Sequence, residues 1–362
     1  MSELDAYKSM AKQRNSNLEL YRIIVMLLIV AHHYVVNSGL MDIMWEDPFS
    51  GKSLFLYWFG MWGKTGINCF VLITGYFMCQ SHITVRKFLK LLLQIEFYKI
   101  IIYAIFVMSG YEEFSLKGLF KLFPVTSVSS GFISCFLLFY LCIPFLNILI
   151  SNLTKRQHQL LLALSLFIYT VLGSTPKLHV EMNYVSWFCI LYFIASYIRL
   201  YGLFPQFSYQ TWGKFSLVSV AFSMTSVLVC LWVGHNVLNI SNLCYYFVSD
   251  SNKILAVVTA VCTFMYFKDL PMSYSPFINA VGASTFGVLL IHANSDTMRQ
   301  WLWRDTFDNV GWYATEYLVW HAVLSVFLIF FVCATIDYGR SRWLERPLFR
   351  RMDVSLEKYH WQ

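Results

Sequence analysis

The sequence predicts an all-α fold: a polytopic membrane helix bundle of about ten transmembrane helices, with both termini in the cytoplasm. Composition, apolar runs and the placement of basic residues each point to it. Of the 362 residues, 58% are hydrophobic and 13% are charged, whereas soluble chains are about 45–50% apolar and about 25% charged. Aromatic residues make up 19%, which suits lipid-facing walls and interfacial belts. This composition excludes a soluble enzyme, a secreted domain and a disordered chain.

Apolar runs near the length of a membrane span, roughly 20 residues, recur along the chain. They lie near residues 18–37, 55–79, 88–109, 131–151, 157–173, 184–201, 212–234, 253–268, 276–294 and 315–338. Turn and breaker residues separate them, as at Gly110, Gly131 and Pro271. The first run contains Arg22 and two histidines, so it predicts a retained helix and not a cleaved signal peptide.

Lysine and arginine residues set the predicted orientation. With a cytoplasmic N-terminus, 17 of them fall in inner segments and 7 in outer segments, as expected when basic loops stay inside. The chain then divides into a transmembrane domain, 1–340, and a basic cytoplasmic tail, 341–362. The expected location is the cell membrane (plasma or inner), and the +7 net charge is explained by orientation without a nucleic-acid partner.

The nine cysteines form no CxxC pair, and almost all of them fall inside apolar runs. They are expected to behave as small hydrophobic residues. Neither a disulfide framework nor a metal site is predicted.

The first run contains charged and ionisable residues at positions where a membrane-spanning helix is normally apolar. Arg22 and His33 are eleven positions apart, which is three turns plus about 20°, so they share one face roughly 16 Å apart. His32 points about 80° away from Arg22 at about 100° per residue. Arg22 alone could snorkel to lipid head groups. Histidine, however, suits a general base near neutral pH, so His33 is the predicted catalytic base.

Other ionisable or polar residues lie in later runs. Lys64 and Asn68 share a face of the second run, where Lys64 could bind a phosphate or carboxylate or form a structural link to Glu96. Glu96 and Lys99 are three apart and spaced to pair. His292 stands near the outer end of the ninth run and could be either functional or a packed histidine.

Four segments together resemble acyltransferase family 3, a group of bacterial membrane O-acyltransferases with about ten spans. The segments are Arg22 followed after ten residues by His33, residues 66–76 ending in Thr74-Gly75-Tyr76, the basic stretch Arg86-Lys87-Phe88-Leu89-Lys90, and residues 283–292 ending in His292. The resemblance extends from about residue 14 to residue 340. In this chain Thr74 stands where the family usually has serine, and Asn68 where aspartate is frequent.

The resemblance implies acyl transfer from cytoplasmic acyl-CoA, most often acetyl-CoA, to a hydroxyl of a cell-surface or lipid-linked polysaccharide such as a capsule or O-antigen. Acyl-CoA is a donor substrate, and no permanently bound cofactor is expected. The expected partners are membrane lipid, acyl-CoA and the glycan. An acyl-histidine intermediate and direct transfer both remain open.

The site predicted on this basis has three groups of residues. The catalytic residues are His33 and Arg22. The residues predicted to support the active site or the oxyanion are Lys64, Asn68, His32, Thr74 and His292. The residues predicted to bind the phosphates of acyl-CoA are Arg22, Arg86, Lys87 and Lys90.

The main alternative is a secondary transporter or flippase of a lipid-linked sugar or small anion, which would also bury ionisable residues in about ten spans. The chain has no repeated halves, which favours the enzyme. A non-catalytic membrane scaffold would leave the shared face of Arg22 and His33 unexplained.

Overall fold

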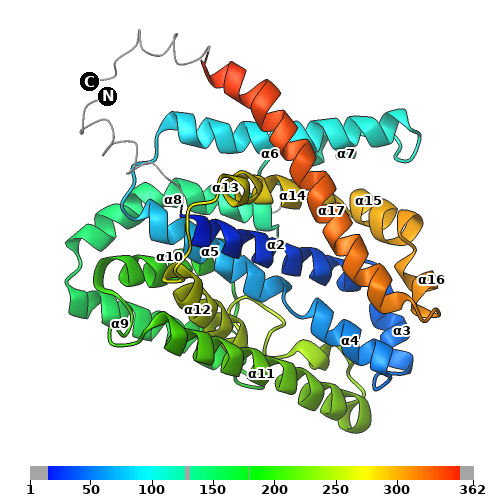
Figure 1. Cartoon of the computed structure of the whole chain (residues 1–362), viewed down its shortest axis with the longest axis horizontal. Helices are drawn as coiled ribbons and strands as arrows, with labels where there is room; N and C mark the ends of the chain where they lie inside the picture. The colour runs from blue at the N-terminus through cyan, green and yellow to red at the C-terminus, as the bar shows by residue number, and fades with distance from the viewer. Residues whose placement is uncertain (1–14, 127–130, 179, 351–362) are drawn as a thin grey trace.

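The computed structural model describes residues 15–126, 131–178 and 180–350. Within these ranges the chain forms helices and no strands (Figure 1), which confirms the predicted all-α fold. In chain order the elements are α2 (Ser16–Val36), α3 (Leu40–Glu46), α4 (Gly51–Gly60), α5 (Gly63–Met78), α6 (Val85–Met108), α7 (Leu116–Lys121), α8 (Phe132–Asn152), α9 (Lys155–Leu166), η1 (Phe167–Leu172), α10 (Tyr184–Tyr201), α11 (Tyr209–Val233), η2 (Gly234–Leu238), η3 (Ser241–Tyr245), α12 (Ile254–Lys268), α13 (Pro276–Ala283), α14 (Thr285–His292), α15 (Asp296–Gln300), η4 (Trp301–Thr306), α16 (Asn309–Tyr313), α17 (Leu318–Arg340) and η5 (Ser341–Glu345).

Six of the described helices are long and apolar enough to cross a membrane, or up to seven if one bent pair is a single span. The six are α2, α6, α8, α10, α11 with η2, and α17 with its continuation to Arg350. The predicted number of ten is therefore not confirmed, because four expected runs form shorter or broken helices. The multi-pass membrane character is supported, and the cytoplasmic placement of both ends stays a prediction.

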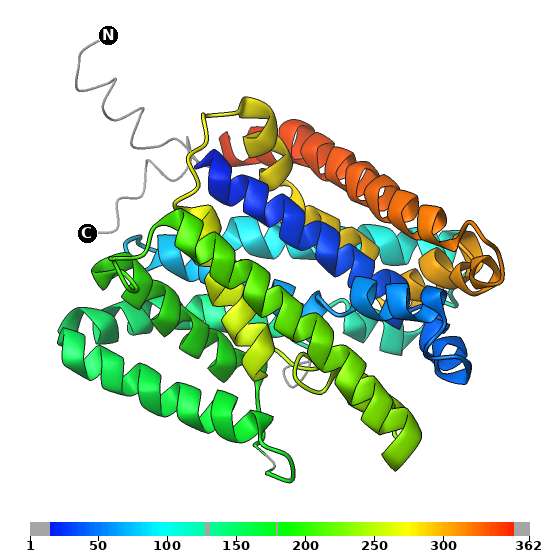
Figure 2. The same cartoon turned by 60° about the horizontal axis from the view of Figure 1, so that its bottom comes forward.

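The central helix of the bundle is α2, which packs against α4, α5, α12, α13, α14 and α17. Figures 1 and 2 show it surrounded by these helices, with α6 and α17 on one side and α10 to α12 on the other. Its buried residues include Val25, Met26 and Val30. Large apolar side chains of the outer helices, such as Phe145 and Phe222, stay exposed, as lipid-facing positions require.

Two of the expected runs are broken near the end of α2. The run at 55–79 divides into α4 and α5 on either side of residues 61–62. The run at 276–294 forms α13 and α14, after which the chain turns by 95° into α15 and η4. Non-helical backbone at membrane depth is tolerated where it is buried in protein or lines a cavity. These two breaks are therefore places where a cavity is expected.

At the end of the bundle away from these two breaks, the start of α6 lies beside the end of the last helix. Lys90 Nζ lies 2.6 Å from Glu345 Oε1 and joins the two. The helix that contains α17 continues through η5 to Arg350, so the predicted domain boundary at residue 340 falls inside a helix. The rest of the predicted tail, 351–362, lies outside the described residues.

Candidate functional site

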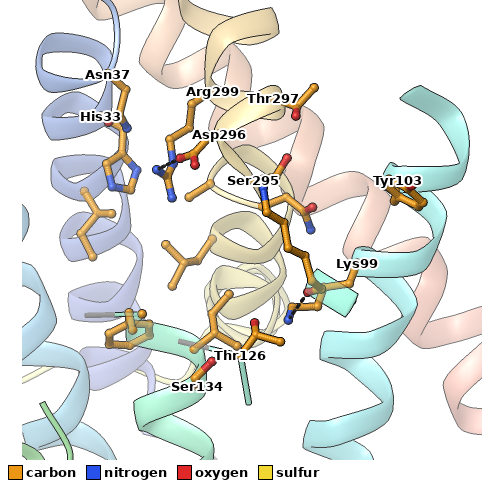
Figure 3. Close-up of a pocket in the computed structure, with 18 of the residues that line it drawn as sticks. His33, Asn37, Lys99, Tyr103, Thr126, Ser134, Ser295, Asp296, Thr297 and Arg299 are labelled. Atoms are coloured by element: carbon orange, nitrogen blue, oxygen red, sulfur yellow. Dashed lines mark hydrogen bonds and ion pairs between the residues drawn. The ribbon is translucent and has the colours of Figure 1, made fainter. Parts of the chain in front are cut away.

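A cavity of about 790 Å³ lies beside the C-terminal half of α2. One wall comes from α2, the start of α5 and the chain from the end of α14 through α15, and the facing wall comes from α6, α7 and the start of α8. His33 and Arg299 stand on the first wall and Lys99 on the second, as Figure 3 shows. The predicted residues that line the cavity are His32, His33 and Lys64.

His33 is joined to a second histidine that comes from a distant part of the chain. Its Nδ1 lies 2.9 Å from Nε2 of His292, and Nδ1 of His292 lies 2.6 Å from the carbonyl oxygen of Val288. A carbonyl can only accept, so Nδ1 of His292 carries the hydrogen. Neutral His292 then accepts at Nε2, and His33 donates from Nδ1. This leaves the lone pair of His33 on Nε2, the nitrogen available to a substrate in the cavity.

His292 is fully buried at the end of α14, one turn from the backbone carbonyl that fixes its ring. It therefore orients His33 and selects its tautomer, the part a second residue plays for many catalytic imidazoles. The sequence left His292 open between a functional and a packed histidine. Its contact with His33 favours a role in positioning.

His32 lines the cavity too, but its Nδ1 lies 2.5 Å from the carbonyl oxygen of Gly60. Gly60 is the last residue of α4, where a helix leaves carbonyls without partners. A Cβ at Gly63 would clash with the His32 ring, so a glycine at residue 63 lets the ring pack against the start of α5. These contacts favour a structural role for His32 at the break between α4 and α5.

Lys64 projects into the cavity from the first turn of α5. Its Nζ donates to the Tyr184 hydroxyl at 2.5 Å and lies 3.8 Å from Asp250 Oδ1. Tyr184 in turn donates to Asp250 at 3.1 Å. This network, and not a link to Glu96, holds the ammonium at the cavity wall.

Asn68 is fully buried and does not line the cavity. Its amide nitrogen donates to the Ser251 carbonyl at 2.7 Å, and its oxygen accepts from Trp187 Nε1 at 3.0 Å. Both ends of the amide are engaged, which favours a structural role. Thr74 likewise lies away from the cavity, and its hydroxyl donates to the Phe70 carbonyl one turn earlier.

Cations gather around the cavity in a way that the sequence did not indicate. Arg299 lies beside His33 and forms an ion pair with Asp296, 2.7 Å between Nη1 and Oδ1 (Figure 3). Lys99 donates to the backbone carbonyls of Lys121 and Phe123, at 3.3 and 2.8 Å. Within the described residues, Lys99 forms no ion pair with Glu96.

Comparison with protein-family models matches residues 15–338 to the family described as an acyltransferase domain, acyltransferase family 3. The chain belongs to this acyltransferase family. Comparison with the curated proteins finds no match, and neither does comparison with the solved structures.

The predicted phosphate-binding residues of the acyltransferase lie apart from the cavity. Arg22 does not line it, and its Nη1 lies 3.8 Å from Glu19 Oε1. Lys87 donates to Ser81 and to the His82 carbonyl, each at 2.8 Å. Arg22 is near the start of α2, eleven residues before His33, and the basic stretch opens α6 at the same end of the bundle (Figure 1).

The other two members of the basic stretch contact the last helix. Lys90 pairs with Glu345, and the guanidinium of Arg86 lies 5.8 Å from the centre of the Phe349 ring. Side chains at the start of α6 therefore help to hold α6 against the last helix.

Sequence reasoning missed Arg299 and the lysines of α7, Lys117 and Lys121, because each sits in a segment expected to be an outer loop. One signal was present: Ser295 follows the apolar run and caps α15 through the Met298 amide, a start signal that predicts a helix turning back at this point. In the described residues, no group of three or more His, Cys, Asp or Glu side chains is placed to hold a metal ion.

Proposed function

We propose that this acyltransferase moves an acyl group, most simply acetyl, from cytoplasmic acyl-CoA to a hydroxyl of a cell-surface or lipid-linked polysaccharide. The observation that carries the proposal is the His33–His292 contact at the wall of a cavity large enough for a sugar. Family membership supports acyl transfer in general. No observation favours the transporter alternative.

The base in this proposal is Nε2 of His33. The acceptor hydroxyl attacks the thioester carbonyl carbon while His33 Nε2 takes its proton, and a C–O bond forms. The tetrahedral intermediate then collapses, the C–S bond breaks, and the CoA thiolate leaves and receives the proton from the His33 imidazolium. The acyl ester and free CoA are the products, and His33 is returned to its starting state.

The charge that develops on the carbonyl oxygen needs fixed donors nearby. Lys64 and Arg299 are the cations on the same wall as His33, and each is held by its own carboxylate, Asp250 and Asp296. These anchors keep the cationic groups in place before the reaction, which is what makes such donors effective. We propose these two residues as the oxyanion donors, in place of Asn68, whose amide is used elsewhere.

For the donor, we propose that Arg22 and the basic stretch at 86–90 receive the phosphates of acyl-CoA. The support is that Arg22 and the basic stretch, which forms the start of α6, lie at the same end of the bundle, opposite the cavity. The acyl chain and its pantetheine arm would have to follow α2 from Arg22 toward His33, a distance of roughly 16 Å along the helix axis.

The test uses purified protein in lipid nanodiscs with radiolabelled acetyl-CoA and a sugar acceptor. His33→Ala is expected to lower kcat by about 10²–10⁴, the usual contribution of a general base. His158→Ala is the control for removing a histidine elsewhere in the bundle, because His158 bonds to the Phe193 carbonyl and does not line the cavity. Equal rates for His33→Ala and wild type at equal folded protein would contradict the proposal.

A further inference from the structure

The charge of the cavity is unbalanced. The cationic residues that line it are Lys64, Lys99, Lys117, Lys121 and Arg299, and the acidic ones are Glu112 and Asp296. A cleft lined by one sign of charge, with low-dielectric walls, focuses its field and concentrates ions of the opposite sign. The ligand of this cavity should therefore be an anion.

Three of these cations have no carboxylate of the described chain in direct contact. Within the described ranges, Lys99, Lys117 and Lys121 take part in no ion pair. Lys117 and Lys121 are exposed on α7, only four residues apart on one side of that helix. Like charges at this spacing repel. An anion bound in the cavity beside the two lysines would offset this repulsion.

The position of α7 is fixed by α6. Lys99 donates to the backbone carbonyl of Lys121, the last residue of α7, and to that of Phe123 just after it. Tyr103 accepts from the Ser115 amide at 3.3 Å, just before α7 begins, and a Cβ at Gly118 would clash with the Tyr103 hydroxyl. The α7 lysines are therefore held at a set place on the wall that faces His33.

Neutral polar side chains that suit a sugar also line the cavity. Asn37, Thr126, Ser134 and Thr297 line the cavity and are drawn around it in Figure 3. Together they offer hydroxyl and amide groups that can donate to and accept from sugar hydroxyls.

We infer that the glycan acceptor is anionic, and that Lys99, Lys117 and Lys121 bind its negative group while one of its hydroxyls faces His33. The inference rests on the proposed function and names the class of its acceptor. The negative group can be the phosphate that joins a sugar to a lipid or the carboxylate of an acidic sugar. Lysine, as a mobile point charge, can bind either one.

The experiment compares three short acceptors with labelled acetyl-CoA: hexyl glucoside, which is neutral, hexyl glucuronide, which carries a carboxylate, and the hexyl phosphodiester of glucose. The quantity measured is selectivity, the kcat/KM of an anionic acceptor divided by that of the neutral one. It does not depend on how much of a variant is folded. We expect wild type to prefer at least one anionic acceptor, and the preferred one identifies the source of the charge.

The double variant Lys117→Gln/Lys121→Gln should lower that selectivity by about tenfold, which corresponds to ~1.4 kcal/mol. Lys177→Gln is the matched control, since Lys177 is exposed and does not line the cavity, and it should leave the selectivity unchanged. If the double variant is inactive, salt gives a second measurement on wild type, because added salt screens the lysines and should reduce the selectivity.

Three results would overturn the inference while leaving the proposed function in place. Equal use of the neutral and anionic acceptors by wild type would show that the cavity does not select charge. A selectivity unmoved by both the variant and salt would show that other groups select it. A raised KM for acetyl-CoA in the variant, with selectivity unchanged, would show that the lysines bind the donor instead. Transfer to none of the three acceptors would count against the proposed function itself, and the inference would fall with it.

Discussion

Replacing His292 by phenylalanine tests the tautomer argument directly. The change keeps a ring at the end of α14 but removes the nitrogen that accepts from His33 Nδ1 at 2.9 Å. His33 then loses the partner that holds its hydrogen on Nδ1. The population with a free lone pair at Nε2 falls, and the ring is no longer oriented toward a substrate.

The size of the effect follows from that one hydrogen bond. A donor left without its partner in a buried setting costs about 1–3 kcal/mol. If the whole cost falls on the transition state, kcat decreases about 5- to 150-fold. Most of this range lies below the loss expected for His33→Ala, about 10²–10⁴-fold, because the base itself is still present. The KM for acetyl-CoA should change little.

A double-mutant cycle decides whether His292 acts through His33. We would measure kcat for wild type, His33→Ala, His292→Phe and the double variant, with His158→Phe as a control for replacing a buried histidine outside the cavity. Residues that act as a unit are non-additive, so the double variant should be no slower than His33→Ala. A full multiplication of the two losses, or a His292→Phe enzyme as fast as wild type, would refute the reasoning.

Three further predictions concern the network around the site and the packing that holds it. Lys64→Met should lower kcat by about 10²–10³-fold with little change in the KM for acetyl-CoA, as removal of an oxyanion donor does; a change confined to KM would show instead that Lys64 binds substrate. Asp337→Ala should destabilise the protein by about 1–3 kcal/mol, because Asp337 is 2% exposed and accepts from Tyr98 and from Arg340, which keeps Glu345 as its other partner at 2.8 Å; an unchanged melting temperature in detergent would contradict this. Gly75→Leu should cost about 1–3 kcal/mol through overpacking, because a Cβ at Gly75 would already lie 2.8 Å from the Cβ of Ala195 on α10; the check is the yield of monodisperse protein, which should drop.

The apolar runs were sufficient to predict an all-helical membrane bundle, because the length and hydropathy of a helix are local properties of the chain. They did not settle the number of full spans, since six of the described helices, or up to seven if one bent pair is a single span, are long and apolar enough to cross a membrane. The run at 55–79 looks continuous, yet it breaks where the His32 ring packs on Gly63 and bonds to the Gly60 carbonyl. That break results from packing between helices. The hydropathy of a single run carries no information about such packing.

Partners across the chain were the least predictable feature. Lys64 and Lys99 were both considered as partners of Glu96 from their spacing and chemistry. In the folded chain Lys64 pairs with Asp250, far along the sequence, and Lys99 bonds to backbone carbonyls near the end of α7. A long flexible side chain takes the partner that tertiary packing brings within reach, and spacing on one helix does not determine which partner that is.

The sequence by itself determined that Arg22 and His33 share one face of the first membrane helix, since the helical period fixes the direction of side chains within a single element. Only the tertiary structure decided that His33 meets His292, 259 residues later, and that lysines from α6 and α7 stand across the cavity from them. Helices far apart in the chain come together according to the shapes and polar groups of their contact surfaces. The proposed catalytic base could thus be inferred from one helix, while the side chains that surround it in the folded chain could not.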